Sequence, residues 1–403
     1  MPISYFIWGK YHTRSFILVF LAHFVLCSFS LRADPFFYFD YIDDTYGLTN
    51  SSIEAIAQDK DGYMWFGTQE GIFQFDGLQS VKYYQDNKQG SLLDDDIFDL
   101  LITEENELWV ATSSAGIARF DRKSETFTHI TDTTYPLKIS HYRVTTIIEV
   151  DDKIWLHTQK GIETINKYDL QIENIPLIYE SNELAEYDSS SLVYFNESVW
   201  TVYKGKLFRT SQDGNRFIEY EFTEKNNDLN SNEIFRIYAT KMRMILHMKG
   251  GLYELNKTEP LGLTILDTKI VIDNNVKIQS VIEDDYGTVW MTIYGEGLFF
   301  KIKGNMEFNH VHSGIARNQL NTKAVIAIYQ DDSNNIWLGT DGNFLVKFRS
   351  PFKLFPFTTN LYSPDENLQT HGIWSILEFN EDFYIGTENG VFKYKESEAL
   401  LSP

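Results

Sequence analysis

The sequence has little cysteine, little proline and no excess of basic residues. Among 403 residues there is one cysteine, Cys27, which excludes a disulfide scaffold, a cysteine-based zinc site and an iron–sulfur cluster. The 9 prolines and 24 glycines exclude collagen-like and proline-rich low-complexity chains. Because 57 acidic residues stand against 35 basic ones, the net charge is -22, and DNA or RNA is not an expected partner.

Long apolar runs are also scarce, and the one that stands out lies at the N-terminus. Lys10 and Arg14 precede an apolar run at residues 16–29, which is too short to cross a bilayer comfortably and suits the core of an export signal. We expect a signal peptide over residues 1–33, with an uncleaved membrane anchor as the alternative. The mature chain, starting at Asp34, is then expected to be periplasmic or extracellular.

Tryptophan is abundant and recurs about every 45 residues, within the period range of propeller repeats. The series runs through Trp65, Trp109, Trp155, Trp200, Trp290 and Trp337, with Ile245 inside the one double gap and Tyr384 continuing it. We expect these residues to have a structural role in every repeat, with the tryptophans packed between neighbouring units.

Most repeats share one internal order of residues. A short apolar run such as Ile53–Ile56 is followed by an Asp/Asn/Gly turn, a tryptophan strand such as Trp65–Thr68, and a glycine that opens a third strand. A looser fourth run closes the repeat. Short strands separated by turns predict antiparallel sheet, and four strands per repeat of this length predict an all-β fold, a β-propeller.

The first repeat resembles the two-component regulator propeller repeat in Gly47–Ile53, Asp59–Thr68 and Gly71–Ile72, and the repeat around Trp337 resembles it as well. The resemblance implies a periplasmic sensor. In that family two seven-bladed propellers usually precede a small β-sandwich, a transmembrane helix and a cytoplasmic histidine kinase or diguanylate cyclase. Some members sense oligosaccharides. Because no such sandwich, helix or output domain is recognised here, we expect a truncated receptor.

The number of blades is open between seven and eight. The family implies a seven-bladed propeller over residues 34–357 that ends at Phe352–Phe357, with residues 358–403 as the first blade of a truncated second propeller. Alternatively, residues 36–39 could supply a missing outer strand to the last repeat and close a ring of eight blades. We favour seven blades plus the remnant.

Candidate ligand-binding residues lie in the loops that follow the Gly-Thr position or precede a first strand. Aromatic and amide side chains there suit a small-molecule or oligosaccharide ligand, by stacking and by paired hydrogen bonds. The candidates are Gln69, Glu70, His141, Tyr142, Arg143, Gln159, Tyr203, Tyr294 and His371.

Several other residues are weaker candidates. His157 and His247 occupy the slot that Gly67 holds in the first repeat, so they either pack in the core or line a pocket. His310 and His312 share one strand face, but no third ligand is evident, so we expect no metal. No catalytic or cofactor motif is found, and no cofactor is expected.

Three functions therefore compete. The first is the extracytoplasmic ligand-binding module of a transmembrane signalling receptor without its output domain, which meets a membrane only through a missing C-terminal part or an uncleaved signal. The second is a lyase-like propeller enzyme with His141, His371 and Glu296 as candidates. The third is a protein-interaction scaffold. The sequence does not predict an oligomeric state.

Overall fold

The computed structural model describes residues 37–49, 52–134, 136–177, 191–222, 233–249, 251–255, 263–267, 277–305, 307–314, 319–342, 344–350, 373–379, 382–387, 390–395 and 400–402. The predicted signal peptide lies outside these residues. Within them, no helix has the length and apolar character needed to cross a membrane.

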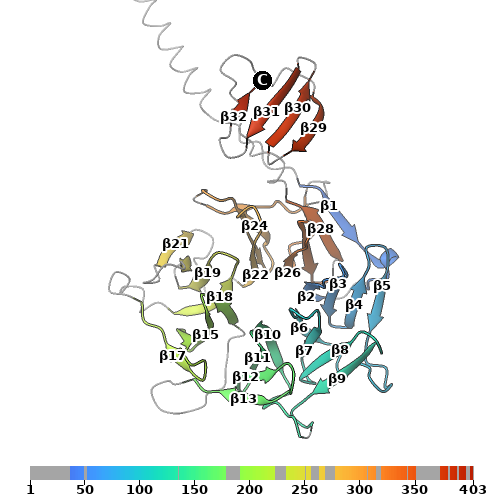
Figure 1. The fold of residues 1–403 in the computed structure, drawn as a ribbon, viewed down its shortest axis with the longest axis vertical. Coiled ribbons are helices and arrows are strands. Elements are labelled where there is room, and N and C mark those ends of the chain that lie inside the picture. Colours follow the sequence, from blue (N-terminus) through green and yellow to red (C-terminus); the bar gives the residue numbers. More distant parts are fainter. Residues whose placement is uncertain are drawn as a thin grey trace, which may run out of the picture. The chain divides into compact units, whose positions relative to one another are not determined.

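The structure is an all-β propeller of seven four-stranded antiparallel blades (Figure 1), as the repeat predicted. Blades 1 to 3 consist of β2 (Ile53–Gln58), β3 (Met64–Thr68), β4 (Gly71–Phe75), β5 (Ser80–Tyr83); β6 (Ile97–Ile102), β7 (Leu108–Thr112), β8 (Ile117–Asp121), β9 (Thr126–Ile130); and β10 (Val144–Val150), β11 (Lys153–Thr158), β12 (Gly161–Asn166), β13 (Ile172–Ile175).

Blades 4 to 6 follow the same order along the chain. They consist of β14 (Leu192–Phe195), β15 (Ser198–Tyr203), β16 (Lys206–Thr210), β17 (Phe217–Glu219); β18 (Ile234–Ala239), β19 (Met244–Met248), β20 (Gly251–Leu255), β21 (Leu263–Asp267); and β22 (Ile278–Glu283), β23 (Val289–Ile293), β24 (Gly297–Lys301), β25 (Asn309–His310). The first strand of each blade lies beside the first strands of its neighbours, around the ring axis.

Blade 7 joins the two ends of the ring. It contains β26 (Val325–Gln330), β27 (Asn335–Thr340) and β28 (Leu345–Arg349), and its outer strand is β1 (Phe39–Ile42), which precedes blade 1 and the short 3-10 helix η1 (Asp44–Tyr46). The pairing corrects one detail of the sequence interpretation. The N-terminal strand had supported an eight-bladed ring, yet it closes the ring of seven. The predicted end of the seventh blade, Phe352–Phe357, lies outside the described residues.

An eighth sheet follows in the chain, consisting of β29 (Ile373–Phe379), β30 (Asp382–Thr387), β31 (Gly390–Lys395) and β32 (Leu400–Ser402). Its first two strands show the same register irregularity, between Ile373 and Ser375, that blade 1 shows between Ile53 and Ala55. This sheet therefore repeats the blade pattern, while the seven-bladed ring is already complete through β1.

The aspartate of the repeat motif holds both the turn and the tryptophan. Asp59 Oδ1 accepts the backbone N–H groups of Asp61 and Tyr63, both at 3.0 Å, and Oδ2 accepts the Trp65 indole N–H at 2.7 Å. The tryptophan is fully buried and lies 5.4 Å, centroid to centroid, from Phe120 of blade 2. One carboxylate thus fixes a hairpin and a contact between blades.

Glycine in the tryptophan strand lets neighbouring blades approach closely. A Cβ atom at Gly67 would lie 2.7 Å from Ile97 of blade 2, and one at Gly339 would lie 2.5 Å from a carbonyl oxygen of blade 1. Either distance is a clash, so a larger residue at this position requires a different spacing to the next blade.

Candidate functional site

The antiparallel blades divide the loops between two faces of the ring. The turns between the second and third strands, together with the connections from one blade to the next, form one face, here called the loop face. The turns between first and second strands and between third and fourth strands form the opposite face, here called the turn face. All the predicted ligand-binding residues that the structure describes belong to elements at the loop-face end of the blades.

Backbone hydrogen bonds fix the loops of this face to one another. Gly71 N–H in blade 1 donates to the carbonyl of Asp95 before blade 2 at 2.8 Å, and Gly116 N–H in blade 2 donates to Tyr142 before blade 3 at 2.7 Å. Gly295 N–H in blade 6 likewise donates to Lys323 before blade 7 at 3.1 Å. Side chains on these loops are therefore presented by an ordered backbone.

Four of the predicted residues come together at blade 3. The His141 and Tyr142 rings are in contact, with centroids 4.2 Å apart and planes tilted by 31°, and the Arg143 guanidinium lies 4.8 Å over the ring of Phe98 in blade 2. Gln159 N–H donates to the Arg143 carbonyl at 3.3 Å. We call residues 136–143 and 159–160 the blade 3 loops.

A buried carboxylate that the sequence did not predict, that of Glu163, bonds to the backbone of the blade 3 loops. Both oxygens of Glu163 accept the backbone N–H of Ser140, at 3.1 and 3.0 Å, and Glu163 is 1% exposed. Burial raises the pKa of Glu163, against the lowering effect of the Ser140 bonds. Phe73 stands in the corresponding register position of blade 1, so a charged group replaces an aromatic one.

Gln69, Glu70 and Tyr294 belong to a second group, on blades 1, 6 and 7. The Tyr294 hydroxyl donates to Asp341 Oδ2 at 2.9 Å, and this hydrogen bond, together with the charge of Asp341, raises the pKa of Tyr294. Gln69 Nε2 donates to Glu54 Oε1 at 3.4 Å, and Glu70 pairs with Lys82 at 2.9 Å. Asp341 and Glu54 were not predicted, since isolated acidic residues at strand ends carry no sequence signal.

The remaining predicted residues do not join these groups. Tyr203 is 5% exposed and packs in the apolar cluster around Trp155. His371 lies outside the described residues. Glu296, which with His141 was a candidate for catalysis, is on blade 6, whereas His141 is on blade 3, and no hydrogen bond or ion pair joins the two within the described residues.

Three ionisable side chains lie along the first and second strands of blades 2, 3 and 5. Burial lowers the pKa of His157 and of His247 to about 4, with the charge of Arg236 adding to the effect at His247. Burial raises the pKa of Asp99 to about 7, although its Oδ2 accepts the Ile147 N–H of blade 3 at 2.9 Å. His157 pairs with Thr145 at 3.0 Å, as a core histidine does.

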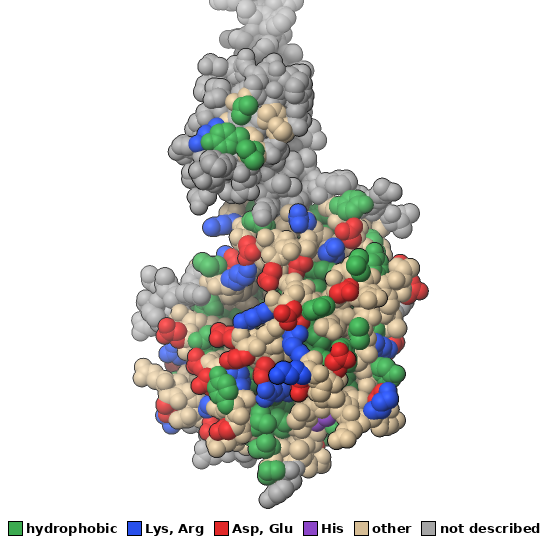
Figure 2. Space-filling view, turned by 45° about the vertical axis from the view of Figure 1, so that its right-hand side comes forward, with side chains coloured by type: hydrophobic (Ala, Val, Ile, Leu, Met, Phe, Trp, Pro, Cys, Tyr) green, Lys and Arg blue, Asp and Glu red, His purple; other side chains and the backbone are tan. Residues whose placement is uncertain are grey.

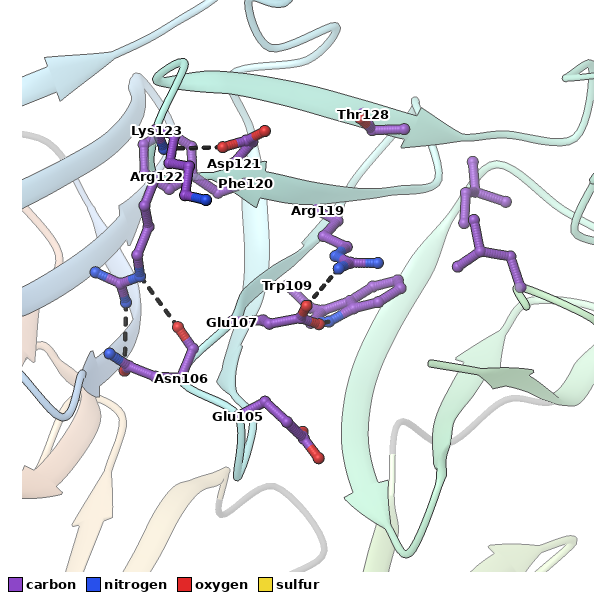
Figure 3. Close-up of a pocket in the computed structure, with 12 residues that line it drawn as sticks. Glu105, Asn106, Glu107, Trp109, Arg119, Phe120, Asp121, Arg122, Lys123 and Thr128 are labelled. Atoms are coloured by element: carbon purple, nitrogen blue, oxygen red, sulfur yellow. Dashed lines mark hydrogen bonds and ion pairs between the residues drawn. The ribbon is translucent and has the colours of Figure 1, made fainter. Parts of the chain in front are cut away.

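A cavity of about 270 Å³ lies along the connection between blades 1 and 2, and other cavities lie at the turn face. One of about 490 Å³ (Figure 3) opens beside Trp109, where Arg119 pairs with Glu107 and Arg122 donates to the carbonyl of Asn106. Two of its charged side chains, Arg119 and Glu107, therefore already pair with each other. His310 donates to or accepts from the Glu296 carbonyl, and no group of three metal-binding side chains occurs among the described residues.

The visible face in Figure 2 carries acidic and basic side chains close together, with hydrophobic side chains in small separate groups. Such a mixed surface is typical of a face that contacts solvent. It presents no broad apolar patch of the kind that marks a protein interface.

Two stretches of the chain, residues 47–70 and 319–342, match the family model of the two component regulator propeller. Two repeats of this chain therefore match that family. The matched stretches are the repeats of blades 1 and 7, the two blades that β1 links when it closes the ring. The comparison with curated proteins found no match.

Solved structures share the fold of this chain. The extracellular domain of a protein described as a hybrid two component system from B. thetaiotaomicron has a TM-score of 0.63 and 20% identity, over 89% of this chain and 48% of that one. Virginiamycin B lyase from Staphylococcus aureus has a TM-score of 0.56 and 14% identity, over 78% and 99%. The chain therefore spans about half the length of the bacterial extracellular domain.

Proposed function

We propose that this regulator propeller is the ligand-binding module of an extracytoplasmic sensor and binds a small molecule or oligosaccharide on its loop face. The proposal rests on the blade 3 loops. There the rings of His141 and Tyr142, the Arg143 guanidinium and the Gln159 amide extend from a backbone that is fixed by hydrogen bonds. A pre-organised polar and aromatic surface lowers the ordering cost of binding. The repeats and the fold shared with an extracellular sensor domain support it.

Ligand-induced shifts of the melting temperature test the proposal. The mature chain is screened with saccharides and other periplasmic solutes, and the Tyr142→Ala and Gln159→Ala variants are screened beside it. We expect at least one saccharide to raise the melting temperature of the parent and not of these variants. Tyr63→Ala, a change at an exposed tyrosine before β3 on the turn face, is the control. No shift with any solute would contradict the proposal.

Export is part of the same proposal. We infer that residues 1–33 direct the chain out of the cytoplasm and are then removed, so N-terminal sequencing of the exported protein is expected to start at Asp34. If the exported protein instead retains these residues in the membrane, they form an anchor and not a cleaved signal peptide. The expectation that the chain lacks an output domain stays a prediction.

We also take residues 358–403 as a blade of a second propeller, separate from the ring. The blade-like register of β29 and β30 supports this. Limited proteolysis of the whole chain should then cut between residues 350 and 373 and leave a folded ring. A cut inside the ring before any cut there would contradict the boundary.

A further inference from the structure

Arg143 is placed to receive an anionic group. It is exposed, and its guanidinium lies over Phe98, with Cζ 4.8 Å from the ring centroid. Within the described part of the chain it makes no ion pair. An arginine stacked on an aromatic ring keeps its planar N–H edge for a second partner, and a carboxylate matches that edge with two parallel hydrogen bonds.

The loop that carries Arg143 is built to hold it in place. The buried Glu163 carboxylate accepts the backbone N–H of Ser140, which lies three residues before Arg143. Burying a carboxylate is costly, and a nonpolar residue fills the same position in blade 1. A residue that lowers the stability of the fold is often retained where function depends on it.

His141 and Tyr142, which precede Arg143 in the loop, can contact the uncharged parts of a ligand. His141 Nδ1 accepts the Arg143 backbone N–H at 3.1 Å, which leaves Nε2 of the neutral ring as the donor. Tyr142 is 43% exposed, so its ring presents an apolar face with a hydroxyl at its end. These groups suit a ring-shaped ligand that has C–H faces and hydroxyl groups.

Charge is unevenly distributed along the loop face. The blade 3 loops and the preceding residues from 131 carry three basic side chains against one acidic, Lys138, Arg143 and Lys160 against Asp132. The segment from 85 to 96, between blades 1 and 2, carries four acidic against one basic, Asp86, Asp94, Asp95 and Asp96 against Lys88. In a chain of net charge -22, an anion would be directed to blade 3.

We propose that the blade 3 loops bind an acidic oligosaccharide, with Arg143 paired to a sugar carboxylate and Tyr142 stacked on the sugar ring. This inference rests on the proposed function and names its ligand class. Glu163 acts as a positioning residue for the loop.

Calorimetric titration of the mature chain with trigalacturonic acid and with its fully methyl-esterified form tests the inference, because the two differ in charge and hardly in shape. We expect the acid to bind at least about tenfold more tightly than the ester. Arg143→Gln should lose that preference, and Arg143→Lys should keep only part of it. Arg216→Gln, at an exposed arginine on the turn face, is the matched control.

The outcomes separate the inference from the proposed function. Equal binding of acid and ester, lost in Tyr142→Ala, would overturn the carboxylate pairing and leave a saccharide-binding loop face. If neither form binds and neutral oligosaccharides fail as well, both proposals are wrong. If Arg143→Gln does not fold, as judged by its melting temperature, the partial preference expected of Arg143→Lys decides the question.

Discussion

The seven blades share one architecture but fall into two groups. Blades 1, 6 and 7 have the motif aspartate, whereas blades 2 to 5 have other residues at that position. In the first group, Asp59, Asp284 and Asp331 each accept an indole N–H and two backbone N–H groups. In the second group Thr103 stands where Asp59 does, and Trp109 bonds Glu107 at 3.3 Å instead. The repeat motif thus supports one part of the ring, and the other part departs from it.

The blades that depart from the motif also hold ionisable groups in the interior, as blades 1, 6 and 7 do with Asp59, Asp284 and Asp331. Asp99, His157, Glu163 and His247, each with a pKa displaced by burial, all belong to blades 2, 3 and 5. Displaced pKa values gather at functional sites more often than elsewhere. Blades 1, 6 and 7 thus keep the motif that holds the tryptophan, while the proposed binding loops belong to blade 3, which departs from it.

The largest effect is expected from breaking the aspartate bonds of blade 1. Asp59→Ala leaves a buried indole N–H, two backbone N–H groups and Arg122 without their acceptor, so we expect a loss of about 3 kcal/mol or more in unfolding free energy. Urea unfolding monitored by tryptophan fluorescence measures it. Asp76→Ala, at a carboxylate that bonds two backbone N–H groups in an exposed turn, should lose much less unfolding free energy. If both variants lose the same unfolding free energy, the motif aspartate is no more important than an aspartate in an ordinary turn.

A pH-dependent effect is expected at Asp99. Its pKa is raised from 3.8 to about 7, so between those values the folded chain holds a proton that the unfolded chain has released. The contribution of Asp99 to stability is therefore most favourable below pH 4 and falls as pH rises to 7. Asp99→Asn cannot titrate and keeps an acceptor for Ile147.

Melting temperatures of both proteins from pH 4 to 8 provide the test. At pH 8 the variant should be more stable than the parent by an amount on the order of 3 kcal/mol, and the two should converge at pH 4. A difference that does not change with pH would mean that the carboxyl group is ionised throughout.

Glu163→Leu should separate stability from binding. The change removes a buried carboxylate whose pKa is raised, so at pH 7 we expect the melting temperature to stay the same or rise. The loop that holds Arg143 loses its anchor, and saccharide affinity should fall about tenfold, or about 1.4 kcal/mol. Glu163→Gln keeps one acceptor for Ser140 and should recover most of the affinity. A variant that melts lower and binds as before would assign Glu163 to the core alone.

The smallest effect is expected at His157. Its pKa is lowered from 6.5 to about 4, so its contribution to stability is complete above pH 6.5 and is lost as pH falls toward 4. The parent should lose about 1.4 kcal/mol at pH 5.5 relative to pH 8 from this residue, and His157→Gln should not. Parallel pH profiles for the two proteins would show that His157 titrates normally.

The ring could be predicted from the sequence because its cause is local and repeated. Spacing of the tryptophans and the alternation of turns and apolar runs follow from strands that are buried in the same way seven times. The pairing of β1 with β28 could be weighed but not decided, since it joins Phe39 to Phe348 across almost the whole chain.

The site could be predicted only in part, because it depends on which loops the ring brings together. The loop positions identified His141, Tyr142 and Arg143, but no sequence pattern placed Phe98 beneath Arg143 or Ser140 above Glu163. Within the strand Gly161–Asn166, Glu163 looks like an ordinary solvent-facing residue. Aligning it with Phe73 of blade 1 through the register is what reveals it as a buried exception.

Hydrogen–deuterium exchange with and without trigalacturonic acid tests the central claim that blade 3 recognises the ligand on the loop face. The account predicts slower exchange in residues 136–143 and 159–160, with residues 104–107 and 121–123 beside the turn-face cavity unchanged. Protection confined to the cavity residues, with none in the blade 3 loops, would contradict it.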